Sequence, residues 1–159
     1  MILIADSSAL VALSIINKLD VLEKLFGKVY VPRAVYDEVI QENKAESYKL
    51  RSYCKEKVLD IKSSVNLNIS LGLGESEAIV LYSEKNADFL LCDDKKAKKF
   101  AQSFGLNVIG SLGILLKAKE KGLISEISSL INILRESQIF IDDKTYALVL
   151  RMAGELQLD

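Results

Sequence analysis

The sequence contains no histidine and has only one proline and two cysteines among its 159 residues. Without histidine, the chain cannot build a Ser-His-Asp triad, a Cys-His dyad or an ordinary histidine-ligated zinc site. Its cysteines, Cys54 and Cys92, lack the spacing of a CxxC motif, and we interpret both as small apolar residues. Any chemistry that this chain performs alone must therefore use carboxylates, hydroxyls, lysines or a metal ion held by carboxylates.

Long apolar runs and an excess of one charge are also missing. The apolar stretches are shorter than the roughly 18 residues that a membrane span needs, and the first residues lack the basic leader of a secretory signal. Lys and Arg total 21 and Asp and Glu total 22, so the formal charge of −1 gives no overall attraction to nucleic acid. We expect a cytoplasmic protein without a membrane anchor.

The composition favours a globular protein, because 50% of the residues are apolar and 27% are charged. A chain of this length is typical of one domain. We therefore expect residues 1–159 to form a single domain, in which the C-terminal helices of 124–159 pack on the rest of the chain or on a partner.

Short apolar segments alternate with helical patterns along the chain. We expect strands at 1–5, 28–31, 89–92 and 108–109. We expect helices from Ser7 or Ser8 to about 19, from 32 with a continuation or restart as far as 58, and at 75–82, 95–104, 111–121, 124–135 and 144–152. This alternation predicts an α/β fold with three α/β/α layers around a mostly parallel sheet.

Acidic residues follow two of the expected strands. Asp6 comes directly after the first, and Asp93 and Asp94 come after 89–92. Because the carboxyl ends of parallel strands meet at one edge of a sheet, these side chains should reach a common edge. Glu38 and Glu75 lie on expected helices, and the pattern does not fix their placement. If these acids converge, their mutual repulsion calls for a cation, and oxygen ligands select Mg²⁺ or Mn²⁺.

Each acid also has a purely structural interpretation. An aspartate after a strand is often a helix cap, and an acid in the first turn of a helix often interacts with the helix dipole. Taken singly, each residue favours that interpretation. The combination of acids at two strand ends, two glutamates on helices and no other catalytic residue type favours function.

Four short segments resemble the acidic motifs of a known family, in both order and spacing. They are IADSSAL at 4–10, VPRAVYDEV at 31–39, GESEAI at 74–79 and LLCDDKKA at 90–97. The chain is similar over residues 1 to about 121 to PIN domains, a family of metal-dependent nucleases that includes the VapC toxins of prokaryotic toxin–antitoxin pairs. The resemblance implies Mg²⁺- or Mn²⁺-dependent hydrolysis of RNA phosphodiester bonds.

The resemblance also implies roles for individual residues. It places catalytic acids at Asp6, Glu38, Glu75 and Asp94, and metal ligands at Asp6, Glu75 and one or both of Asp93 and Asp94. The family's usual hydroxyl-x-Asp pattern aligns Cys92 with the hydroxyl, which makes Asp94 the matching acid. Glu75 is preferred over Glu77, which points about 200° away around the helix.

Substrate-binding residues follow from the same segments. Ser8 is the small hydroxyl that accompanies the first aspartate, and Arg33 beside the second motif is a candidate phosphate contact. Lys95 and Lys96 begin a basic helix that starts at the acids and could guide phosphates toward them. The alternative interpretation, a solvated helix face, has equal weight.

The C-terminal helices carry more apolar residues than a core needs, and the resemblance implies a homodimer and an antitoxin protein as partners that could use this surface. Two other functions stay open. One is a PIN-like RNA-binding or interaction module without activity. The other is a receiver-like domain with Asp60 as phosphoacceptor, which fits less well because Ser7 replaces the second of two adjacent acids.

Overall fold

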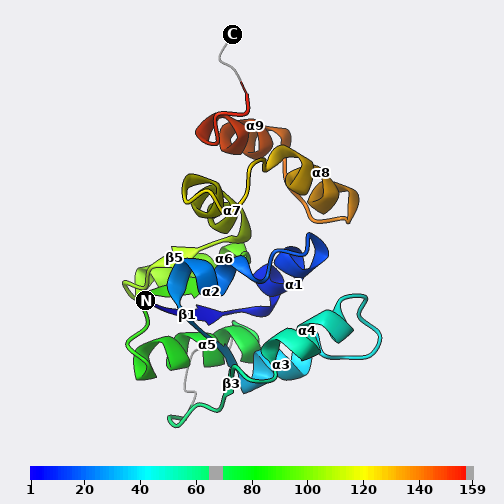
Figure 1. Cartoon of the computed structure of the whole chain (residues 1–159). Helices are drawn as coiled ribbons and strands as arrows, with labels where there is room; N and C mark the ends of the chain where they lie inside the picture. Colours follow the sequence, from blue (N-terminus) through cyan, green and yellow to red (C-terminus); the bar gives the residue numbers. More distant parts are fainter. Residues whose placement is uncertain (65–69, 157–159) are drawn as a thin grey trace.

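The computed structural model describes residues 1–64 and 70–156 and is built around a parallel sheet (Figure 1). Its strands are β1 (Ile2–Ala5), β2 (Lys28–Pro32), β3 (Val58–Leu59), β4 (Phe89–Leu91) and β5 (Val108–Ile109). Its helices are α1 (Ser7–Ile15), α2 (Val21–Phe26), α3 (Arg33–Val39), α4 (Ser47–Cys54), α5 (Leu73–Glu84), α6 (Lys95–Ser103), α7 (Ser111–Glu120), α8 (Ser128–Glu136) and α9 (Asp143–Met152).

The strand order is β3-β2-β1-β4-β5, and every pairing in this five-stranded sheet is parallel. The central strand β1 has a continuous apolar sequence because helices cover both of its faces. Leu3 pairs with Val29 on one side and with Phe89 on the other. The chain order therefore reverses between β1 and β4, and the carboxyl ends of these two strands form the crevice in which α/β proteins bind ligands.

Helices cover the two faces of the sheet, which confirms the expected three-layer α/β/α fold. Leu3 and Leu91 point to the face that carries α1, α2 and α7, whereas Ile4 and Leu90 point to the face that carries α5 and α6. In Figure 1, α5 lies on one side of the sheet and α7 on the other. The alternation of side chains along β1 and β4 thus divides the core into two buried clusters.

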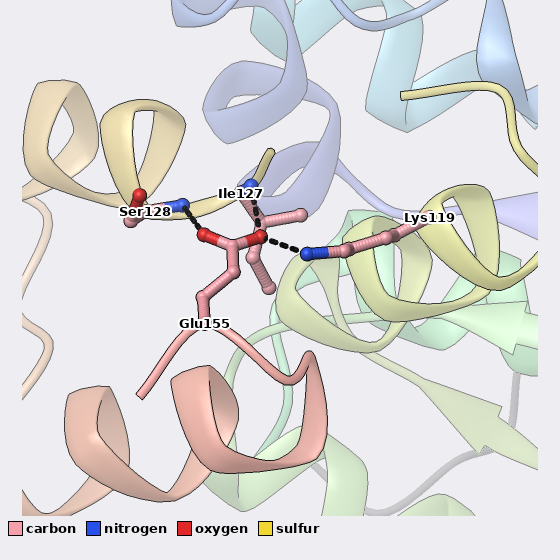
Figure 2. Close-up of polar contacts among 4 residues, drawn as sticks. All are labelled: Lys119, Ile127, Ser128 and Glu155. Carbon is pink, nitrogen blue, oxygen red and sulfur yellow. Dashed lines mark hydrogen bonds and ion pairs between the residues drawn. The ribbon is translucent and has the colours of Figure 1, made fainter. Parts of the chain in front are cut away.

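The C-terminal helices extend the first of these clusters. Ile131 and Leu134 of α8 and Leu150 of α9 are buried with residues of α1 and α7, and Figure 1 shows α8 and α9 stacked beyond α7. A carboxylate fastens this junction. Glu155 Oε1 accepts hydrogen bonds from Lys119 Nζ at 2.5 Å and from the Ile127 N–H at 2.7 Å, as drawn in Figure 2.

Several expected boundaries were wrong. The first helix ends at Ile15 instead of continuing to about 19, and α2 follows as a separate short helix. The helical segment expected to reach 58 restarts as α4 but ends at Cys54, and residues 58–59 form the edge strand β3 beside β2. Helix α8 begins at Ser128 instead of 124, and Ile124 and Ile127 are buried in the connection that precedes it.

The strands at the centre of the sheet lie where the sequence places them, and so do the helices that follow β4 and β5. Among the residues that the structure describes, none of the helices combines the length and apolar character required to cross a membrane.

Candidate active site

Asp6 lies at the carboxyl end of β1, at the crevice of the sheet. It occupies the N-cap position of α1, but its side chain makes no capping hydrogen bond. Only 1% of the residue is exposed, and its Oδ2 atom accepts a weak bond from the Cys92 thiol at 3.5 Å. Its Oδ1 atom is buried and has no hydrogen-bond partner among the residues that the structure describes. The structural interpretation as a helix cap therefore does not account for Asp6.

Burial raises the pKa of Asp6 from its ordinary value to about 6. The negative charges of Glu75 and Glu38 act in the same direction, whereas the nearby Ser7 N–H and Cys92 thiol oppose the rise. The sheet edge thus holds a buried carboxylate whose charge lacks compensation, and whose acidic neighbours are the two glutamates that the sequence singled out.

Gly74 explains how the acids can approach one another. A methyl group built at this position would lie 3.8 Å from Asp6 Oδ1, 3.4 Å from Glu38 Oε2 and 3.2 Å from Val35 Cγ2. Asp6 and Glu38 therefore point to the same small space, which stays open because residue 74 has no side chain. The glycine belongs to α5, which begins one residue before it.

Glu75 and its neighbour Glu77 have different environments on α5. Glu75 lies in the first turn, and its carboxylate folds back over Gly72 at the start of the helix. Glu77 Oε2 instead accepts a hydrogen bond of 2.8 Å from the Ala34 N–H and so ties α5 to the first turn of α3. Glu77 therefore has a structural partner that leaves Glu75 as the acid beside Asp6.

Glu38 lies on α3 and is half-buried. Its Oε1 atom is 3.8 Å from Lys44 Nζ, in an ion pair whose side chains are 45% and 42% exposed. Lys44 lies outside the four acidic segments, so nothing in the sequence singles it out. Only the loop between α3 and α4 brings this lysine back to the acid.

Asp93 and Asp94 follow β4 but serve two different helices. Asp94 is the N-cap of α6, where its Oδ1 atom accepts a bond of 2.8 Å from the Ala97 N–H. Asp93 turns toward α7, where its Oδ1 atom accepts a bond of 2.7 Å from the Ser111 N–H. The structural interpretation of these aspartates as helix caps is thus present in both, in contrast to Asp6.

Ser8 and Cys92 connect the two strand ends. Ser8 Oγ accepts a hydrogen bond of 3.2 Å from the Asp93 N–H. Cys92 lies between the acids, since its thiol contacts Asp6 Oδ2 and the backbone oxygen of Asp94 at 3.7 Å. Burial raises the pKa of this thiol well above its usual range, and the charges of Asp6 and Asp94 add to the rise, so the group stays a neutral thiol.

The candidate phosphate contacts lie outside this buried group. Lys95 and Lys96 are exposed in the first turn of α6, directly after Asp94. Arg33 is also exposed, and its Nε atom donates to Asp60 Oδ1 at 3.1 Å. Asp60 follows the edge strand β3, so the residue considered as a phosphoacceptor is distant in the strand order from the crevice between β1 and β4.

A divalent ion requires several oxygen ligands around one point. In residues 1–64 and 70–156, no three acidic or cysteine side chains are already arranged as a set that could hold a metal ion. The donor chemistry nevertheless suits Mg²⁺ or Mn²⁺, because Asp6 contributes a buried oxygen without a partner and Glu38 an oxygen that faces the same space over Gly74. A bound cation would compensate the buried charge of Asp6 and its repulsion from Glu75 and Glu38.

The chain thus combines a parallel sheet with acidic residues at the crevice between β1 and β4. A family model described as a PIN domain matches residues 2–155. No curated protein matches the chain. Because the family match covers nearly the whole sequence and agrees with the α/β/α layers, the chain belongs to the PIN-domain family.

Proposed function

We propose that this protein is a Mg²⁺- or Mn²⁺-dependent ribonuclease whose active site lies between the carboxyl ends of β1 and β4. The observation that carries the proposal is Asp6, a buried carboxylate that caps no helix and faces Glu38 across the space at Gly74. A family whose members are generally nucleases that use divalent metals provides the second support. A carboxylate held in this way is destabilising for the fold, and a cation would relieve it.

In this proposal, Asp6, Glu75 and Asp94 hold the cation, and Glu38 completes the acidic group. Asp94 is preferred over Asp93 because its charge acts on Cys92, which contacts Asp6, whereas Asp93 points to the first residue of α7. Asp93 is the alternative ligand. When bound, a divalent ion supplies a Lewis acid for the scissile phosphate and a water of lowered pKa.

The other residues position the substrate and the acids. Ser8 fixes the backbone of Asp93 and thereby the start of the turn that carries Asp94. Lys95 and Lys96 project from the first turn of α6 and would contact RNA phosphates next to the acids. Arg33 would contribute a more distant phosphate contact after exchange of its exposed partner Asp60.

A role as the toxin of a toxin–antitoxin pair is a narrower form of this proposal. We take residues 1–159 as one domain, with α8 and α9 packed on the remainder. Helix α9 presents Leu148 and Met152, which are 53% and 66% exposed. An antitoxin or a second copy of the chain would cover these side chains in the proposed assembly. Growth arrest on expression, relieved by the Asp6→Asn substitution, is the expected outcome for a toxin.

A module that binds RNA without cleaving it is the second candidate. The capping bonds of Asp93 and Asp94 favour it, because both aspartates have structural roles that do not need an ion. Asp6 favours catalysis over this candidate, because its side chain makes no capping hydrogen bond.

The test is cleavage of single-stranded RNA with Mn²⁺ by the wild-type chain, Asp6→Asn and the matched control Asp37→Asn, an exposed acid on the same helix as Glu38. We expect Asp6→Asn to lose at least about 100-fold in rate, since loss of an ion-binding group weakens both metal affinity and activity. Asp37→Asn should cleave at the wild-type rate. Calorimetry with Mn²⁺ should show the same ranking of affinities. Equal cleavage by Asp6→Asn and the wild type would refute the proposal.

A further inference from the structure

A cavity lies beside the candidate active site, on the side of Asp93 that faces the C-terminal helices. It has a volume of about 270 Å³ and is bounded by the first turns of α6 and α7 and by the connection between α8 and α9. This is slightly below the roughly 300 Å³ at which typical ligand pockets begin, so it suits one nucleobase better than a larger cofactor. Asp93 belongs to both its wall and the turn after β4.

An aromatic ring forms part of this cavity. Phe140 lies in the connection between α8 and α9 and is 84% exposed, although it is flanked by the less exposed Ile139 and Ile141. Exposing a phenylalanine to this extent is unfavourable in water. A phenyl ring at the wall of a small cavity is a surface on which a nucleobase can stack.

Two lysines stand on the same wall. Lys95 and Lys98 of α6 line the cavity, and in residues 1–64 and 70–156 neither forms an ion pair within 4.0 Å. The acids that line it are engaged, since Asp93 accepts from the Ser111 N–H at 2.7 Å and Asp142 from the Thr145 N–H at 2.7 Å. The hydrogen bonds from Thr145 lower the pKa of Asp142, and the charge of Lys95 adds to this effect from beyond ion-pair distance. Both lysines therefore lack a close ion pair among the described residues and can contact phosphates, while the carboxylates are held by helix N-termini.

Gly110 keeps the cavity open. A methyl group built at this residue would lie 2.8 Å from Asp93 Oδ1 and 3.3 Å from Lys98 Nζ, which is too close for the first atom and tight for the second. The absence of a side chain at position 110 therefore allows the lysine and the aspartate to line the same wall.

From these observations, we infer that Phe140, Lys95 and Lys98 form a subsite that binds one unpaired nucleotide of single-stranded RNA next to the scissile position. The base stacks on Phe140, and the lysines contact the flanking phosphates. The inference rests on the proposed ribonuclease function and narrows its substrate to single strands, because both faces of a base within a duplex are stacked on its neighbours and are not available to the exposed phenyl ring of Phe140.

The experiment measures binding of the full chain, carrying Asp6→Asn to prevent cleavage, to three RNAs: a short single strand, its blunt duplex, and the same strand with abasic positions. Phe140→Ala should weaken single-strand binding on the order of 10-fold, because stacking on one aromatic side chain contributes about that factor. Phe140→Trp should retain wild-type affinity. Phe104→Ala removes another exposed ring, 63% exposed at the far end of α6, and serves as the matched control that leaves affinity unchanged.

The abasic strand should bind the parent chain and Phe140→Ala equally well, since it offers no base to stack. Replacing both lysines by methionine should reduce the slope of log affinity against log salt by about 1 or more. Equal losses in Phe140→Ala and Phe104→Ala, or equal affinity for duplex and single strand, would overturn the subsite.

Cleavage by the chain without Asp6→Asn separates this inference from the proposed function. Metal-dependent cleavage without any effect of Phe140→Ala on binding overturns the subsite alone. A Phe140-dependent preference for single strands in a chain that does not cleave supports the subsite and contradicts the ribonuclease.

Discussion

Two shielded carboxylates, Asp6 at the sheet edge and Glu155 at the C-terminal junction, have opposite environments. Asp6 is 1% exposed, and within residues 1–64 and 70–156 its Oδ1 atom has no hydrogen-bond partner. The Glu155 side chain is 11% exposed, and its two oxygens accept bonds from Lys119 Nζ and from the N–H groups of Ile127 and Ser128 (Figure 2). Burial alone would raise the pKa of Glu155, but these donors lower it to about 2, whereas the pKa of Asp6 rises to about 6.

The difference separates an acid with structural hydrogen-bond partners from the acid that we propose as functional. Glu155 joins α7, the start of α8 and the end of α9, so its charge stabilises the packing of the C-terminal helices. Asp6 opposes folding in the absence of a cation, because its buried charge lacks compensation. A buried charge without compensation is unfavourable for folding. Such a residue at the crevice of an α/β sheet is typical of a functional site.

The largest effect on stability is expected from Glu155→Ala. Removal of the carboxylate leaves the Lys119 ammonium and two N–H groups without their acceptor, and the free energy of unfolding should fall by about 3 kcal/mol. Urea denaturation at pH 7 measures the change, with Glu126→Ala as the control at an exposed acid in the connection that contains Ile127. A loss within about 0.5 kcal/mol of the control would contradict the role of the clamp.

The contribution of Glu155 to the free energy of unfolding should depend on pH. Since the folded-state pKa of Glu155 lies below its usual 4.5, its contribution is complete above pH 4.5 and is lost as pH falls toward about 2. The stability difference between the wild type and Glu155→Ala should therefore shrink on acidification. A difference that is constant from pH 7 to pH 3 would assign the loss to packing instead of charge.

Asp6→Asn should have the opposite sign. In metal-free buffer at pH 7, we expect this substitution to raise the free energy of unfolding on the order of 2 kcal/mol, because it removes a buried charge. Burial raises the folded-state pKa of the wild-type carboxyl to about 6, above its usual 3.8. The folded state therefore holds this proton more tightly than the unfolded chain does, and the stability that this provides declines as pH rises from about 3.8 to about 6. The advantage of Asp6→Asn should therefore vanish below about pH 4.

Thermal denaturation across pH 4 to 8 measures this advantage, with Asp37→Asn as the control. Excess Mn²⁺ should reverse the ranking at pH 7, because only the wild-type carboxylate gains from a cation. An Asp6→Asn variant that is less stable than the wild type in metal-free buffer would contradict the interpretation of Asp6 as uncompensated.

Smaller effects should distinguish the two aspartates after β4. Asp93→Ala and Asp94→Ala each remove a capping bond and should lower stability by about 1 kcal/mol. Asp94→Asn keeps a capping oxygen and should retain stability, yet it should lose metal-dependent cleavage if Asp94 is the ligand. Wild-type cleavage by Asp94→Asn together with inactive Asp93→Asn would transfer the role to Asp93.

Gly74→Ala should have the smallest effect on stability. The gain in helix propensity, about 1 kcal/mol, offsets the tight contact of the new methyl with Val35 Cγ2 at 3.2 Å. Its methyl would fill the space that Asp6 and Glu38 share, so Mn²⁺ affinity should fall in calorimetry while the denaturation midpoint barely moves. Unchanged Mn²⁺ affinity would show that the ion does not occupy this space.

Much of the central fold was predictable because the signals are local. The apolar runs at β1 and β4 and the acids that end them are consecutive in the sequence, and parallel strands bring their carboxyl ends together. The edge strand β3 and helix α2 were missed because each is too short to show a periodicity. The sequence named the site residues as separate candidates. It could not show which of them are close together, because that depends on how α3 and α5 pack against the end of β1.

The sequence by itself determined which chemistry is available: without histidine, the chain offers carboxylates, hydroxyls and lysines, and acids follow two of its strands. It also determined the α/β layering, because alternating apolar runs and helical periodicities are properties of neighbouring residues. Only the tertiary structure decided which acids accept capping hydrogen bonds and which acid is buried with an oxygen atom that lacks a partner among the described residues. Asp6 and Glu155 both carry a carboxylate, and their pKa values depend on the donors that distant segments supply or fail to supply and on the water that packing removes.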